Sequence, residues 1–215
     1  VLSSQLTQLL GKRKMYAWVR FFTISFSIAG LLQLWPVNVV LAFAVFILLL
    51  IAFFIFLSKD LKNNSDIKNT EILIKINEQE ILVLKHQYTH LPDGLQYKPE
   101  EHDYANDLDI FGKASLYQYI NRTTAEQAGQ LLSEWLLAPA TNEIIIARQE
   151  AVKELNQKPE WRQQLQAIGT EKRITIETER KILIWLKEEN KFSGTFWKVT
   201  RLLYPIITLS LLFLF

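Results

Sequence analysis

The pattern of apolar and polar positions divides the chain into two apolar ends and an amphipathic middle. Residues 17–35 and 37–57 are apolar runs, and the second of them carries no charged residue. A helix rises 1.5 Å per residue, so each run can cross roughly 30 Å of hydrocarbon. Since helices of soluble proteins rarely lack a polar face for so long, we predict a transmembrane helical hairpin in residues 1–58, with Trp35 and Pro36 in its turn.

Basic residues flank the hairpin at its two outer ends, and its turn carries no charge. They are Lys12, Arg13, Lys14 and Arg20 on the first run and Lys59 and Lys62 after the second. The positive-inside rule therefore predicts that both ends lie on the cytoplasmic side of an inner membrane. Residues 202–215 are apolar again and follow Lys191, Lys198 and Arg201, so we expect a third, truncated span there and a multi-pass protein.

Residues 59–105 are predicted to form an amphipathic connector helix followed by a loop. Ile67, Ile74 and Ile81 recur every seven residues, which predicts one long helix leaving the membrane. Its apolar face needs a partner, and packing on its own domain is favoured over a dimerising coiled coil. The sequence Leu91-Pro-Asp-Gly94 then ends the helix.

Histidines around this break raise the question of a metal site. They are His86, His90 and His102, the last followed by Asp103. The helix break separates them, and their spacing matches no recognised set of ligands. A solvated loop is therefore favoured, and no metal-binding residue is predicted.

Residues 106–200 carry start and stop signals for several helices. Thr123 or Thr124 is predicted to cap a helix that has Glu126 in its first turn and stops at Pro139. A second start signal is Thr141-Asn-Glu143, and Pro159 suits the first turn of a third helix.

Apolar stripes at helical spacing predict the buried faces of this region, and Gly169 is a predicted helix stop. The stripe residues are Leu116, Tyr119 and Ile120, then Trp135, then Ile144, Ile145, Ala147, Ala151, Val152 and Leu155, and finally Trp161, Leu165 and Ile168.

Four stretches of the middle region stand in a recognisable order: DLDIFG, SLYQYINRTT, LLSEWLLAP and IIIARQEAVKEL. This order resembles the core, or lever, region of the MutS family of mismatch-repair ATPases. The resemblance implies an all-α fold, binding of mismatched DNA, dimerisation, and a C-terminal ATPase domain that would use ATP and Mg²⁺ and is absent from these residues. The mismatch-reading module of the family is also absent, since no Phe-x-Glu motif occurs.

Chemical motifs are missing from the chain itself. It has no cysteine, and none of its seven glycines belongs to a G-x-x-x-x-G-K-[ST] phosphate loop. We therefore assign no catalytic, cofactor-binding or metal residue, and a structural role is favoured for Arg122, Thr123 and Arg148 over a ligand contact. The net charge of +2 does not by itself indicate a nucleic-acid surface.

Two functions fit these observations. The first is the N-terminal membrane and core part of a MutS-like ATPase, coupling the nucleotide state of the absent domain to a change at DNA or at the membrane. The second is a non-enzymatic membrane scaffold whose cytoplasmic helices bind a protein partner. The expected fold is all-α: the hairpin, the connector, a helical core-like domain in residues 106–200 and the start of a third span.

Overall fold

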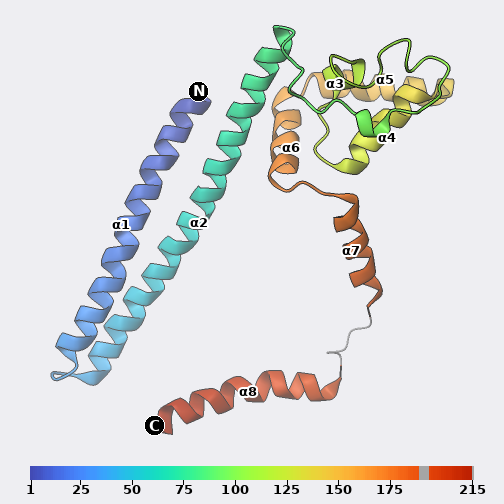
Figure 1. Ribbon diagram of the computed structural model, residues 1–215. Coiled ribbons are helices and arrows are strands. Elements are labelled where there is room, and N and C mark those ends of the chain that lie inside the picture. The colour runs from blue at the N-terminus through green and yellow to red at the C-terminus, as the bar shows by residue number, and fades with distance from the viewer. Residues whose placement is uncertain (189–193, 215) are drawn as a thin grey trace. The chain divides into compact units, whose positions relative to one another are not determined.

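The computed structural model describes residues 1–188 and 194–214, and these residues form helices and no strand (Figure 1). The predicted all-α fold is therefore confirmed for them, whereas the predictions for Lys191 and Phe215 fall outside the described residues. The chain divides into two compact units, Val1–Ile174 and Thr175–Phe215. The first unit holds α1 (Leu2–Leu34), α2 (Val39–Leu84), the short turn η1 (Leu95–Tyr97), α3 (Leu116–Ile120), α4 (Glu126–Leu137), α5 (Asn142–Asn156) and α6 (Pro159–Glu171). The second holds α7 (Ile176–Lys187) and α8 (Thr195–Leu214).

Helices α1 and α2 form an antiparallel hairpin, as predicted (Figure 1). α1 ends at Leu34, and the side chain of Asn38 caps α2 by accepting a hydrogen bond from the amide of Leu41 at 3.1 Å. Both helices are long and apolar enough to cross a membrane. Among the described residues, α8 does not meet the same criteria of length and apolar composition. The third span therefore stays a prediction.

Contacts along the hairpin fix its register. The rings of Tyr16 and Phe56 lie 6.4 Å apart, and the Asn63 amide donates a hydrogen bond to the Leu9 carbonyl at 3.0 Å. Small residues, which let helix backbones approach closely, occupy the contact nearer the turn. They are Ser27 and Ala42, both fully buried.

Helix α2 is a single helix of 46 residues that runs from the apolar hairpin into the polar connector without a break. Its buried positions beyond the apolar run are Asn63, Ile67, Thr70, Leu73, Ile76 and Val83. The seven-residue repeat lies within this one helix but does not mark a single buried face, because Ile67 is buried, Ile74 is half-buried and Ile81 is 52% exposed. A straight helix of 3.6 residues per turn drifts away from a strict seven-residue repeat, and α2 changes partner from α1 to α6 along its length.

The outer half of α2 packs on its own domain, as the sequence favoured. Leu73 and Ile76 form a buried cluster with Ala167 of α6, and Leu2 at the start of α1 packs against it. Two amide pairs flank this cluster, Asn69 with Gln164 and Asn77 with Gln163, each at 3.1 Å. The N-terminus of the hairpin, α2 and α6 therefore meet at one junction.

The main core of the domain surrounds Tyr117. It consists of Ala105, Ile110, Phe111 and Tyr117, with partly buried Tyr97, Tyr104, Leu132, Leu136 and Leu137 packed against it. The predicted stripe Leu116, Tyr119 and Ile120 is wrong, because these side chains are 43%, 42% and 40% exposed. α3 has only five residues, so the loops on either side decide which of its faces is buried.

Some helix ends follow their local signals and others do not. Thr141 precedes α5, Pro159 starts α6 and Glu126 lies in the first turn of α4, as predicted. Hydrogen bonds from its own backbone amide and from Thr141 lower the pKa of Glu143, which supports the α5 start. The predicted Thr cap of α4 is wrong, because Ala125 is the capping residue.

Gly169 does not end α6, which continues to Glu171. Instead the helix passes so close to the loop before α4 that a Cβ atom on Gly169 would lie 2.1 Å from Thr124 Oγ1 and 2.9 Å from Thr124 Cβ. Glycine is therefore required for close packing at this position.

The large apolar residues of α4, α5 and α6 are less buried than predicted. Trp135, Trp161, Leu165 and Ile168 are 46%, 53%, 56% and 58% exposed, and α5 has no buried residue. In α6 the residue buried against α2 is Ala167, because the close helix contact selects a small side chain.

Replacing Gly169 by Ala should destabilise the protein by about 1–3 kcal/mol, because the new methyl group overlaps Thr124. Thermal unfolding of the detergent-solubilised protein, followed by circular dichroism, measures the change. The matched control is Gly11→Ala in α1, which has nothing within 4 Å and should be neutral or stabilising by up to about 1 kcal/mol. Adding Thr124→Gly to Gly169→Ala should recover part of the lost stability. Equal stability of the Gly169→Ala and Gly11→Ala variants would contradict the close packing of Gly169 against Thr124.

Candidate functional site

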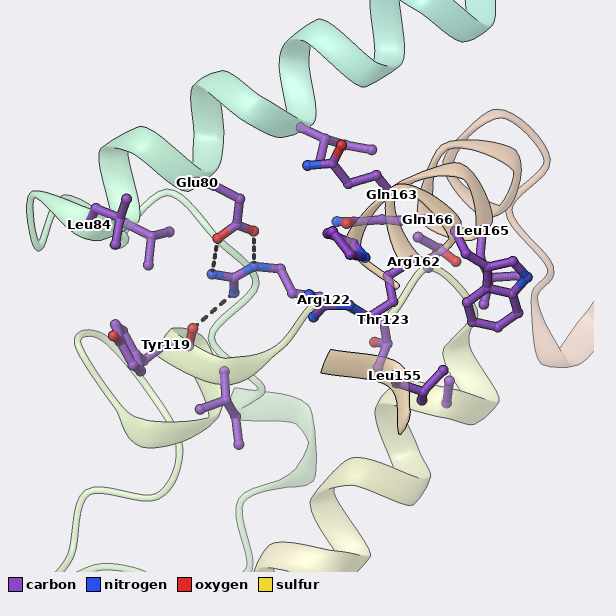
Figure 2. Close-up of a pocket in the computed structure, with 17 residues that line it drawn as sticks. Glu80, Leu84, Tyr119, Arg122, Thr123, Leu155, Arg162, Gln163, Leu165 and Gln166 are labelled. Atoms are coloured by element: carbon purple, nitrogen blue, oxygen red, sulfur yellow. Dashed lines mark hydrogen bonds and ion pairs between the residues drawn. The ribbon is translucent and has the colours of Figure 1, made fainter. Parts of the chain in front are cut away.

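A groove of about 700 Å³ lies where the outer end of α2, α3, the loop before α4, and α6 come together (Figure 2). Its apolar lining includes Leu84, Ile120, Trp161 and Leu165. Two exposed apolar residues of α6 that were predicted to be buried, Trp161 and Leu165, thus form one wall of the groove.

The charged part of the groove is the pair formed by Arg122 and Glu80. Arg122 Nε donates to Glu80 Oε1, and Arg122 Nη2 donates to Glu80 Oε2 at 3.1 Å (Figure 2). Arg122 Nη1 also donates to the carbonyls of Tyr119 and Asn121, each at 2.9 Å. The planar guanidinium therefore links α2 to the end of α3. It does so through a bidentate pair of hydrogen bonds to the carboxylate, a geometry that arginine provides.

The residues next to Arg122 form a turn that holds this geometry. Asn121 Oδ1 accepts hydrogen bonds from the Thr123 amide at 2.9 Å and from the Thr123 hydroxyl at 2.7 Å. The Thr123 hydroxyl is thereby used within the turn rather than at the start of α4. Arg122 and Thr123 therefore both have structural contacts within the domain.

Arg148 of α5 also makes a contact inside the domain. Its guanidinium lies 3.8 Å from the centre of the Trp135 ring, which is a cation–π arrangement. The contact joins α4 to α5 and accounts for a large aromatic residue at a half-exposed position. Arg148 therefore contributes to the packing of α4 against α5.

Gln118 is a buried polar residue that sequence reasoning missed. Its Nε2 donates to the carbonyls of Thr89 at 3.1 Å and Leu91 at 2.5 Å, and its Oε1 accepts from the Ala114 amide at 2.8 Å. Gln118 is 2% exposed, so its hydrogen bonds satisfy backbone groups of the loop after α2 in place of water. A glutamine inside a short apolar helix was the signal available in the sequence.

Tyr117 is the other buried group that the sequence did not indicate. Its hydroxyl donates to the Gly129 carbonyl at 3.2 Å, and its ring lies against Gly94, which has a positive φ of 70°. Burial, and to a lesser extent the neighbouring Tyr97, raises the pKa of Tyr117 to about 12. Tyr117 therefore stays protonated at physiological pH and acts as a hydrogen-bond donor in the core.

His102 and Tyr104 hold the end of α4. His102 Nε2 lies 2.9 Å from the Leu137 carbonyl, and the Tyr104 hydroxyl donates to the Leu136 carbonyl at 2.9 Å. Carbonyls at a helix end have no partner within the helix, so these side chains act as a cap. Among the described residues, no group of three or more His, Cys, Asp or Glu side chains is placed to hold a metal ion.

A comparison with protein families finds a match in the central part of the chain. Residues 99–182 match the model of MutS domain III, which supports a MutS-related family. The match includes α3 to α6, the cap formed by His102 and Tyr104, and Arg122. No curated protein and no solved structure matches the chain.

Arg122→Lys should destabilise the domain by about 1–3 kcal/mol, since a single ammonium group cannot hold both carboxylate oxygens and two carbonyls. Glu80→Gln should cost less, because it removes the charge but keeps a hydrogen-bond acceptor. Thermal unfolding compares both with Lys158→Gln, which breaks an exposed pair with Glu154 and should leave the stability nearly unchanged. A cost for Arg122→Lys no larger than for this control would contradict the role of Arg122.

Alkaline titration should show that Tyr117 ionises late. Tyr117 has a folded pKa of about 12, above its ordinary 10.0, so its contribution to stability is complete below pH 10 and is lost as the pH rises towards 12. Tyrosinate absorbance of the folded protein measures this step. Tyr117→Phe should remove it and Tyr119→Phe, at a 42% exposed position, should not; a step that survives Tyr117→Phe would belong to another residue.

Proposed function

We propose that this chain is the membrane-attached lever of a MutS-like, mismatch-repair-related protein. A lever here means a rigid helical part that transmits motion between two sites. The lever would couple the nucleotide state of an ATPase domain, encoded outside these residues, to a change at DNA or at the membrane. The family match over residues 99–182 supports the MutS-like part of this proposal.

The continuity of α2 is the observation that carries the lever role. A helix of 46 residues is roughly 70 Å long, and its two halves have different surroundings. The apolar half pairs with α1, while the outer half is held to α6 by the Leu73 cluster and to α3 by Arg122. A displacement of the region that matches MutS domain III would therefore move the outer half of α2 with it.

The surface of the hairpin supports a membrane location. Apolar side chains that face away from the helix contact include Phe26, Val40 and Leu48, which are 63%, 79% and 67% exposed. Such a surface is unfavourable in water and matches a lipid environment. With basic residues at its outer ends, the hairpin would place the helical domain on the cytoplasmic side.

A membrane scaffold that binds a protein partner remains a second candidate. The observation that favours it is the apolar surface of α5, which has no buried residue. Ile144, Ile146 and Val152 on this helix are 45%, 57% and 66% exposed. This function would require no nucleotide.

ATP hydrolysis by the full-length protein in lipid nanodiscs distinguishes the two functions. The lever proposal predicts Mg²⁺-dependent hydrolysis, and mismatched DNA should stimulate it more than homoduplex DNA at a fixed, stated salt concentration. Hydrolysis that is indifferent to DNA would keep the ATPase and remove DNA as the substrate. Absence of both nucleotide binding and hydrolysis would overturn the lever proposal and leave the scaffold.

A further inference from the structure

The hairpin carries a band of positive charge at one height. The contacts of Leu9 with Asn63 and of Tyr16 with Phe56 place residues 9–16 of α1 beside residues 56–63 of α2. The basic residues of these two segments are all exposed: Lys12, Arg13, Lys14, Lys59 and Lys62. We call this set the basic band.

Asp60 is the one acidic residue in these two segments, and an arginine from outside the band neutralises it. Arg20 Nη2 lies 2.9 Å from Asp60 Oδ2, and the two side chains are 28% and 14% exposed. Helical side chains lean towards the N-terminus of their helix, which in α1 is the direction of the band. The ion pair therefore leaves the charge of the band uncancelled.

An aromatic row begins one helical turn below the band. Trp18, Phe22 and Phe26 follow Lys14 at steps of four residues, so the four side chains share one face of α1. Trp18 stacks on Phe22 at 5.8 Å and Phe22 stacks on Phe26 at 6.2 Å. The three rings are 59%, 48% and 63% exposed, so this face is not covered by α2.

The height of the band matches that of lipid phosphates. From Asn38 at the turn to Lys59, α2 rises roughly 30 Å, which is the thickness of the hydrocarbon core. We propose that this face of the hairpin binds an anionic phospholipid, with its phosphate at the basic band and an acyl chain along the aromatic row. This inference rests on the membrane location in the proposed function.

Clusters of lysine and arginine next to a membrane helix attract anionic headgroups, whereas a zwitterionic headgroup carries no net charge to attract. The aromatic row adds a contact for the chain of the same lipid. The site is therefore expected to select phosphatidylglycerol over phosphatidylcholine, and it should require the lipid rather than free phosphate.

Native mass spectrometry of the full-length protein in mild detergent, titrated with each lipid, tests this selectivity. The wild type should retain phosphatidylglycerol in preference to phosphatidylcholine, and inorganic phosphate should not compete. The triple variant Lys12→Gln, Arg13→Gln, Lys14→Gln should lower this preference by on the order of 10-fold or more. The matched control changes the exposed Lys113, Lys153 and Lys172 to Gln, which removes the same charge elsewhere and should leave the preference intact.

The aromatic row has its own test. Trp18→Leu with Phe22→Leu should reduce retention of phosphatidylglycerol, whereas Phe54→Leu, at a 57% exposed position of α2, should not. Equal retention of both lipids by the wild type, or equal effects of the triple variant and its control, would overturn the lipid site alone. Extraction of the wild-type protein from membranes by alkaline carbonate would instead overturn the membrane location on which the site rests.

Discussion

The antiparallel contact between α1 and α2 is the constraint on which the rest of the first unit depends. Small side chains at Ser27 and Ala42 let the two helices approach, and the bond from Asn63 to the Leu9 carbonyl keeps the register beyond the apolar part. This register carries Leu2 to the cluster of α2 and α6. The start of the chain, the hairpin and the helical domain are therefore joined through packed contacts as well as through the chain.

The polar residues of the region that matches MutS domain III serve its internal geometry. Arg122 is bonded to Glu80 and to two carbonyls, Gln118 holds the loop after α2, and His102 lies at the end of α4. Side chains with their bonds satisfied inside the domain make it rigid rather than reactive. Such a region suits the transmission of motion, in agreement with the lever role proposed from the continuity of α2.

Features set by neighbouring residues were predictable from the sequence, and features set by distant contacts were not. The hairpin, its turn, and the starts of α5 and α6 follow from apolar length, Thr141 and Pro159. The buried faces of α3, α4 and α6 were mispredicted, because α3 is too short to show a stripe and the contact of α2 with α6 selects Ala167 over the larger Trp161.

Gly169 has the local signal of a helix stop, and its role in packing against Thr124 is visible only in three dimensions. The groove shares this origin, since Glu80 and Arg122 are brought together by the fold.

The proposed lipid contact restricts how the proposed lever could move. If lipid phosphates hold the basic band at the membrane surface, sliding α2 along its axis towards the turn would drag Lys59 and Lys62 into hydrocarbon, at a cost of several kcal/mol for each charge. Tilting or rotating the hairpin keeps both residues at the surface. The paired Arg20 and Asp60 connect α1 to α2 just at this height, so the two helices would tilt together. A motion of the helical domain would therefore reach the membrane as a change of tilt, not as a movement of α2 through it.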